Sequence, residues 1–76
     1  MPSLRKSFGA RLRHIRRARD LSQERFAEVL GVSVDFLSLI ERGINSPSFD
    51  RLEQIAKRLR VPVKDLFDFP EKRRSN

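Results

Sequence analysis

The chain has 76 residues, of which seventeen are Lys or Arg and ten are Asp or Glu, so its formal net charge is +7 at pH 7. A chain of this length forms one small domain. Its core is thin, because folding buries only about 60% of the surface of the unfolded chain. It contains no Cys and a single His, His14, which excludes disulfide frameworks, thiol nucleophiles and Cys/His zinc sites. We therefore expect neither a metal nor a cofactor, and a reducing cytoplasm suits the composition.

The N-terminal residues do not form a targeting signal. Residues 1–8 carry charge, but they are not followed by an apolar run of the length that a signal peptide needs. No stretch of about 18 apolar residues occurs anywhere in the chain. We expect a cytoplasmic protein that is neither secreted nor membrane-spanning.

The first expected element is an amphipathic helix from Leu4 to Arg19. Its apolar residues Leu4, Phe8, Leu12 and Ile15 recur at spacings of four and three, which places them on one face. This pattern predicts a helix with one buried stripe.

The same segment concentrates positive charge. Seven basic residues precede Asp20 without an acid among them: Arg5, Lys6, Arg11, Arg13, Arg16, Arg17 and Arg19. Such a stripe is typical of a surface that binds a polyanion, nucleic acid before an anionic membrane, although a solvated helix face is the alternative. A second basic cluster, 72–74, lies in a tail over 70–76 that we expect to be disordered.

A short second helix is expected over 23–30. Ser22 stands where an N-cap would be, and Gly31 stands where a left-handed residue would end the helix. A third helix follows over 33–42, capped by Ser33 and closed by Gly43 in the same manner. Two short helices joined by a tight turn have the lengths of a helix-turn-helix, whose second helix enters the DNA major groove.

A fourth helix is expected to have Pro47 at its first position, where a missing N–H costs least, and to end before Pro62. A last short helix is expected over 63–68. No segment alternates apolar and polar residues as a half-buried strand would. The fold class is therefore all-α.

The last element is richer in apolar residues than one face of so short a helix can bury. We expect some of these residues to form a twofold contact between two copies of the chain, and the alternative is that all of them close the core. The residues are Val63, Leu66, Phe67 and Phe69.

Residues in and around the paired helices stand in a known pattern. They are Leu21-Ser22-Gln23-Glu24, Ala27, Leu30-Gly31-Val32-Ser33 and Ser38-Leu39-Ile40-Glu41-Arg42-Gly43, followed by Pro47-Ser48 and Ile55-Ala56. In these positions the chain resembles the phage-repressor (XRE) helix-turn-helix family over roughly 8–66. The resemblance implies a compact five-helix, lambda-repressor-like DNA-binding domain, here over 4–69, with its helix-turn-helix over about 23–42.

Helical geometry predicts which face of the third helix would read DNA. At 100° per residue, Leu37 and Ile40 point toward the core, and Phe36 lies at the edge of the same arc. The opposite arc presents five side chains to base edges: Val34, Asp35, Ser38, Leu39 and Arg42.

The resemblance also implies roles outside this arc. Gln23, at the start of the second helix, would hold a backbone phosphate. Arg13, Ser33 and Asn45 are assigned to the same phosphate-binding group. Arg16 and Glu41 match positions that pair inside the family fold, so we expect a structural ion pair between them.

Three residues depart from the family pattern. Arg25 replaces the Glu that would complete a capping box with Ser22. Asp20 stands where the family usually has Gly, and Asp tolerates the left-handed conformation. Leu39 stands where many relatives carry a polar or basic reader, so apolar contact with thymine methyl groups is expected there. Asp35 could accept a hydrogen bond from a cytosine amino group.

Other functions fit less well. An enzyme would depend on His14, which lies among arginines, and an RNA-binding protein would need exposed aromatic residues for stacking. An antitoxin-like protein-binding module that also binds DNA remains open. We expect no small-molecule effector domain, because 76 residues leave no length for one. We expect a sequence-specific transcriptional regulator that binds double-stranded DNA as a homodimer, on a roughly palindromic operator.

Overall fold

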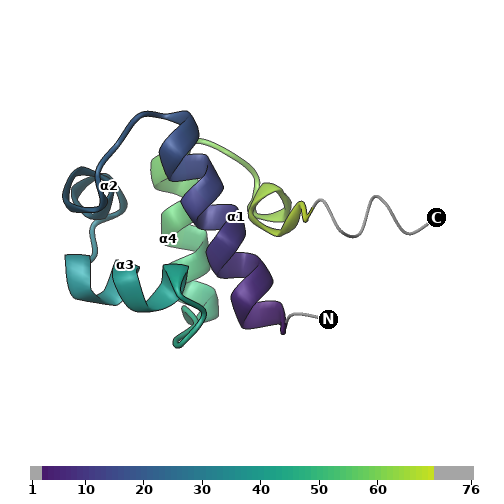
Figure 1. Ribbon diagram of the computed structural model, residues 1–76. Coiled ribbons are helices and arrows are strands. Elements are labelled where there is room, and N and C mark those ends of the chain that lie inside the picture. The colour runs from purple at the N-terminus through teal and green to yellow at the C-terminus, as the bar shows by residue number, and fades with distance from the viewer. Residues whose placement is uncertain (1–2, 70–76) are drawn as a thin grey trace.

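The computed structural model describes residues 3–69, which form four α-helices and a final 3-10 helix. The elements are α1 (Leu4–Ala18), α2 (Gln23–Leu30), α3 (Val34–Glu41), α4 (Phe49–Leu59) and η1 (Val63–Phe67). In Figure 1, α1 crosses α4 at the centre, with α2 and α3 on one side and η1 on the other. The all-α prediction is confirmed for the described residues. The expected basic tail lies outside them.

Each α-helix begins after a serine whose hydroxyl caps it. The Oγ atom accepts a hydrogen bond from the backbone N–H three residues later, at 3.0 to 3.2 Å, in Ser3, Ser22, Ser33 and Ser48. Such a cap contributes about 1 kcal/mol to the stability of the helix it begins. Short polar signals in the sequence thus fix where four elements start.

The predicted start of the fourth helix was wrong. Ser48 is the cap of α4 and Phe49 is its first residue, so Pro47 precedes the cap instead of opening the helix. The Ser48 hydroxyl accepts a hydrogen bond from the N–H of Arg51. The side chain of Pro47 has no acceptor atom, so it could not cap the helix in this way.

A left-handed residue ends or follows each of the four α-helices. Gly31 ends α2 with φ of 75°, and Gly43 has φ of 77° just beyond α3. Asp20 adopts φ of 60°, in agreement with the expectation that Asp tolerates this conformation. Arg60 ends α4 with φ of 61°, a position that the sequence did not mark.

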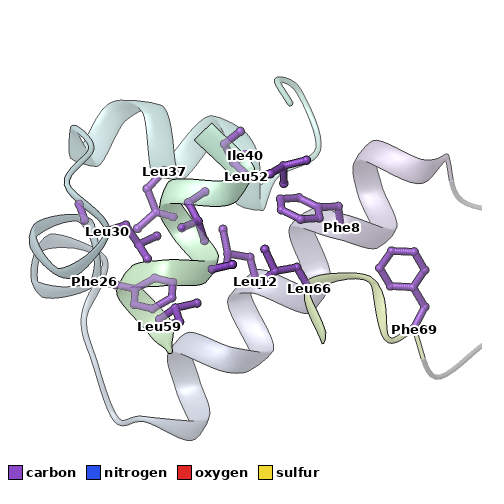
Figure 2. Packing of buried hydrophobic residues seen from close by; sticks show 13 residues of the cluster. Phe8, Leu12, Phe26, Leu30, Leu37, Ile40, Leu52, Leu59, Leu66 and Phe69 are labelled. Carbon is purple, nitrogen blue, oxygen red and sulfur yellow. The ribbon is translucent and has the colours of Figure 1, made fainter. Parts of the chain in front are cut away.

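Within residues 3–69, thirteen buried apolar residues form one core. Figure 2 shows Phe26 of α2 beside Leu59 of α4, with Leu37 of α3 directed toward α4 farther along that helix. Phe36 is partly buried against this core, as predicted. The paired helices are therefore held to α4 by their inner faces, which leaves their outer faces to solvent.

Gly9 sets how closely α3 approaches α1. A Cβ atom at this position would lie 2.3 Å from the carbonyl oxygen of Ile40 and 2.8 Å from that of Glu41. Both oxygens belong to the backbone, so they cannot move aside as a flexible side chain would. Because Gly9 has no side chain, the backbone of α3 can approach the backbone of α1 closely at this position.

For two of the four residues predicted to form a twofold contact, the structure favours the alternative that they close the core. Leu66 is 0% exposed and Phe69 is 4% exposed, because both complete the core of a single chain. These two residues have no surface left for a partner. Phe67 is half-buried against Phe8, with ring centroids 5.2 Å apart, and Val63 is 39% exposed.

Candidate nucleic-acid interface

The outer face of α3 carries the five predicted base-reading residues. Leu37 and Ile40 are each 1% exposed and define the inner face. The five predicted readers retain solvent exposure: Val34, Asp35 and Arg42 are exposed, and Ser38 and Leu39 are half-buried. In Figure 1, α3 lies at the edge of the molecule, and no other element covers its outer side. The geometry is that of a helix able to enter a groove.

A hollow of about 290 Å³ separates α1 from the end of α3, and we call it the α1–α3 hollow. It brings together six side chains from three helices: Arg13, Arg16, Gln23, Ser38, Glu41 and Arg42. Two of them are predicted base readers and two are predicted phosphate ligands. The remaining two form an ion pair at the floor of the hollow.

Arg16 and Glu41 are joined by two hydrogen bonds. The Nε atom of Arg16 donates to Oε2 of Glu41 at 2.8 Å, and Nη2 donates to Oε1 at 3.1 Å. Their side chains are only 13% and 3% exposed. Arg16 also donates through Nη1 to the carbonyl of Leu21, at 2.9 Å. One guanidinium thus ties α1, α3 and the turn before α2 together.

Gln23 gives the same carboxylate a third donor. Its Nε2 atom donates to Oε1 of Glu41 at 3.0 Å. This contact holds the Gln23 amide at the mouth of the α1–α3 hollow and leaves its second N–H available. The Ser22 hydroxyl accepts from the N–H of Arg25, and the N–H groups before it in the first turn of α2 have no intrahelical acceptor, so they add donors at the same end of the helix.

Three bases of α1 are exposed on the side that borders α3. Lys6, Arg13 and Arg17 lie within about 40° of one another around the helix axis. Their side chains have no hydrogen bond or ion pair among residues 3–69. Lys6 also lies beside Gly43, just past the end of α3. We call these three residues the α1 stripe.

The other four bases before Asp20 bind the protein itself, which narrows the predicted positive surface. Arg16 pairs with Glu41, as described above. The remaining three donate to backbone carbonyls: Arg5 to Ile44 at 3.2 Å, Arg11 to Asp65 at 2.8 Å, and Arg19 to Leu59 at 3.1 Å. A count of charges in the sequence therefore overstates how many face a ligand.

The two other predicted phosphate ligands lie at opposite ends of α3. The Ser33 hydroxyl caps the helix by accepting from the N–H of Phe36, and its own O–H remains able to donate. Asn45 is exposed in the loop after α3, where its backbone N–H donates to the carbonyl of Leu39 at 3.3 Å. These residues flank the reading face instead of joining the α1–α3 hollow.

The family model for the helix-turn-helix domain matches residues 7–68. The chain belongs to the helix-turn-helix domain family. Members of this family are DNA-binding domains of the type found in transcriptional regulators. The predicted resemblance to phage repressors is therefore confirmed.

Relatives and solved structures of this helix-turn-helix domain are regulators. The control protein C.BamHI of Bacillus amyloliquefaciens is 40% identical over 68 residues, which cover 88% of this chain and 84% of that protein. The phage CTXphi transcriptional repressor RstR of Vibrio cholerae is 36% identical over 78% of this chain and 53% of its own length. The restriction-modification controller protein C.AhdI of Aeromonas hydrophila superposes with a TM-score of 0.76 at 33% identity, over 83% of this chain and 91% of that one.

Other relatives are longer than this domain. The chain covers 42% of the uncharacterized regulator Rv0474 of Mycobacterium tuberculosis, at 44% identity over 59 residues. No helix in the described part is long and apolar enough to cross a membrane. Within residues 3–69, no group of three or more His, Asp or Glu residues is placed to hold a metal ion.

Polar side chains of α4 hold the turn of the helix-turn-helix, and sequence reasoning missed them. Gln54 donates through Nε2 to the carbonyl of Leu30 at 2.8 Å, and Arg58 donates to that of Val29 at 3.2 Å. Arg51 bonds to Gln54 at 3.4 Å and places its guanidinium carbon 5.5 Å from the centre of the Phe36 ring. The spacing of these three residues by three and four on one helix face was the available signal.

Proposed function

We propose that this helix-turn-helix domain is a sequence-specific transcriptional regulator that binds a roughly palindromic operator as a homodimer. The observation that carries the proposal is the outer face of α3, where five side chains are presented away from Leu37 and Ile40. A helix with such a face fits the major groove, where each base pair shows a distinct pattern of donors and acceptors. We propose the cytoplasm as its location.

Base reading is assigned to the middle of this face. Asp35 accepts from a cytosine amino group, Leu39 contacts thymine methyl groups, and Ser38 bonds to either kind of base edge. Val34 and Arg42 border these three residues. Because Asp35 is negative, it lowers affinity for DNA in general and raises it only where a donor is present.

Phosphate binding is assigned to residues around the face. Arg13 supplies charge from the α1 stripe, and Gln23 supplies neutral donors at the N-terminus of α2. Ser33 and Asn45 supply further donors at the two ends of α3. Phosphate contacts fix the register of the domain on the duplex, so they favour all sequences equally.

The Arg16–Glu41 pair supports this arrangement without touching DNA. Glu41 would repel phosphates if its charge were exposed, but three donors surround its buried carboxylate. The acid therefore fixes the position of α3 against α1 while the outer surface of the α1–α3 hollow stays positive.

Selection of bound sites from random duplex DNA tests the proposal. We expect enrichment of a motif with twofold symmetry whose half-site centres lie about one helical turn, roughly 34 Å, apart. Recovery of DNA without any common motif would contradict sequence-specific recognition. A motif without symmetry would contradict the homodimer while leaving sequence reading intact.

The antitoxin-like alternative keeps one observation in its favour, which is exposed apolar surface. Phe49 is 86% exposed and Leu4 is 64% exposed, beside a groove that the core does not fill. A protein partner of a different kind would bind there without any symmetric operator.

A further inference from the structure

An apolar groove of about 480 Å³ lies between the start of α1 and the start of α4, and we call it the α1–α4 groove. Its apolar walls are Leu4, Phe8, Pro47, Phe49, Leu52 and Phe67. Two of these walls, Leu4 and Phe49, are among the most exposed large apolar residues of the described chain. In a domain with so few apolar residues, such a concentration marks an interaction surface.

The position of Phe49 indicates what the groove receives. Its ring is 86% exposed at the edge of a groove that it also lines. A projecting aromatic ring and an apolar recess that could hold such a ring therefore lie side by side. In a twofold contact, each surface meets an identical copy, and residue i of one chain meets residue j of the other in both directions. A projection beside its own recess is the shape that such a contact requires.

We propose that two copies of this chain pair through the α1–α4 groove, with Phe49 of each copy inserted into the groove of the other. The assignment deepens the proposed function, on which it rests, by naming the surface that makes the homodimer. It moves the twofold contact away from Leu66 and Phe69, which are buried, and keeps Phe67 as a shared wall.

Charge on the rim of the groove fits a second copy. Two chains of formal charge +7 repel each other, so they can approach only where positive charge is low or matched. Among the described residues, Arg5 is the one charged residue that lines the groove. It donates to the carbonyl of Ile44 but keeps its charge and remains exposed, and exposed Asp50 follows Phe49 directly. Insertion of Phe49 therefore brings Asp50 toward Arg5 of the partner subunit, and the twofold axis repeats this pairing.

The size of the surface indicates a weak dimer. A fully buried Phe removes about 150–250 Å² from solvent, so two rings and their surroundings fall short of the roughly 1,200–2,000 Å² of a stable interface. The loop that leaves α3 supplies Ser46 and Pro47 to the groove, which keeps the pairing surface close to the end of the reading helix. DNA that holds two copies side by side therefore completes an association that is weak in free solution.

Sedimentation equilibrium of the full chain without DNA, from micromolar to near-millimolar concentration, tests the contact. We expect the wild type to dimerise reversibly and Phe49→Ser to weaken the dimer by at least about 30-fold, since a central aromatic residue is lost from each half. Val63→Ser is the matched control, because Val63 is partly exposed but lies outside the groove. Circular dichroism verifies that every variant is folded.

Charge reversal gives a second test that does not depend on an apolar substitution. Arg5→Asp and Asp50→Arg should each weaken the dimer, and the double variant should restore it because the pairing is only exchanged. A dimer that survives Phe49→Ser, or reversals whose double variant fails to recover, would overturn the proposal. So would a chain that stays monomeric and binds paired half-sites without cooperativity.

Binding to duplexes with one or two half-sites separates this proposal from the proposed function. Phe49→Ser should bind a single half-site like the wild type and lose cooperative binding to two. If the wild type dimerises through Phe49 but selects no sequence, the proposed function fails and the interface stands. If it selects a sequence while Phe49→Ser keeps full cooperativity, the interface assignment fails.

Discussion

At the scale of single residues, neighbouring groups in the α1–α3 hollow differ in their contacts, and we propose separate roles for them. Arg13 is exposed and free to neutralise a phosphate, whereas Arg16, three residues later, is held by Glu41 and the carbonyl of Leu21. Gln23 lies between the two tasks, since one N–H reaches Glu41 and the other is available to a ligand. Charge and hydrogen bonding can therefore be separated experimentally.

Arg13→Ala and Gln23→Ala should both weaken binding to all DNA sequences, but only the first should change the salt dependence. Loss of one phosphate contact by a charged group lowers the magnitude of the slope of log K against log salt by about 0.9. Neutral Gln23 releases no counterion, so its slope should remain near that of the wild type. Salt titrations on one fixed duplex measure both slopes. An unchanged slope for Arg13→Ala would remove Arg13 from the phosphate contacts.

The Arg16–Glu41 pair should show strong coupling in stability. Removal of either partner leaves a buried charge unmatched, and a loss of about 3 kcal/mol is expected for a well-buried pair. The double substitution should cost less than the sum of the two single ones, by about 1 kcal/mol or more. Denaturant unfolding of Arg16→Met, Glu41→Leu and the double variant provides the cycle. Additive losses would show that the bidentate contact contributes no coupling.

At the scale of elements, α3 is positioned by contacts with α1 and α4. Gly9 admits the α3 backbone from one side, and Arg51 and Gln54 hold the Phe36 ring and the α2–α3 turn from the other. The first is a close approach without a side chain, and the second is a set of polar contacts. Under the proposed function, reading specificity would depend on both, because a shift of α3 would displace every proposed base contact together.

Gly9→Ala should destabilise the domain, although the same change in most helices is favourable. At an exposed helical position Ala exceeds Gly by about 0.5–1 kcal/mol. Here the new Cβ meets two backbone carbonyls, and overpacking of this kind costs about 1–3 kcal/mol, so the net sign reverses. Thermal unfolding measures the result. Ala10→Gly, at the exposed neighbouring position, is the control and should lose only the propensity difference.

Local signals predicted more of the elements than long-range ones did. Serine caps and helical periodicity act within four residues, so α1, α2 and α3 were found nearly to the residue. Pro47 misled because proline before a cap and proline at the first helical position look alike in sequence. The burial of Leu66 and Phe69 depends on packing against distant helices, which periodicity within a five-residue element does not encode.

At the scale of the whole molecule, charge and apolar surface are separated. The α1 stripe and the reading face of α3 lie together, while the α1–α4 groove carries the exposed Phe49 and Leu4. Sequence alone predicted which face of α3 is exposed, because helical geometry around the buried Leu37 and Ile40 determines it. It missed the groove, since exposure of Phe49 follows from where α4 begins, and that start was predicted two residues too early.

The central claim is that specificity resides on the outer face of α3, and substitution of Asp35 and Leu39 tests it most directly. Neither side chain is part of the buried core, so both variants should keep nearly full stability. Affinities of wild type, Asp35→Ala and Leu39→Ala are measured at fixed salt against a panel of single-base operator variants. Asp35→Ala should relax discrimination at one base pair per half-site by about 1–3 kcal/mol and raise nonspecific affinity, and Leu39→Ala should weaken the preference for thymine. If both variants keep the wild-type rank order across the panel, the reading face lies elsewhere and the assignment of α3 is contradicted.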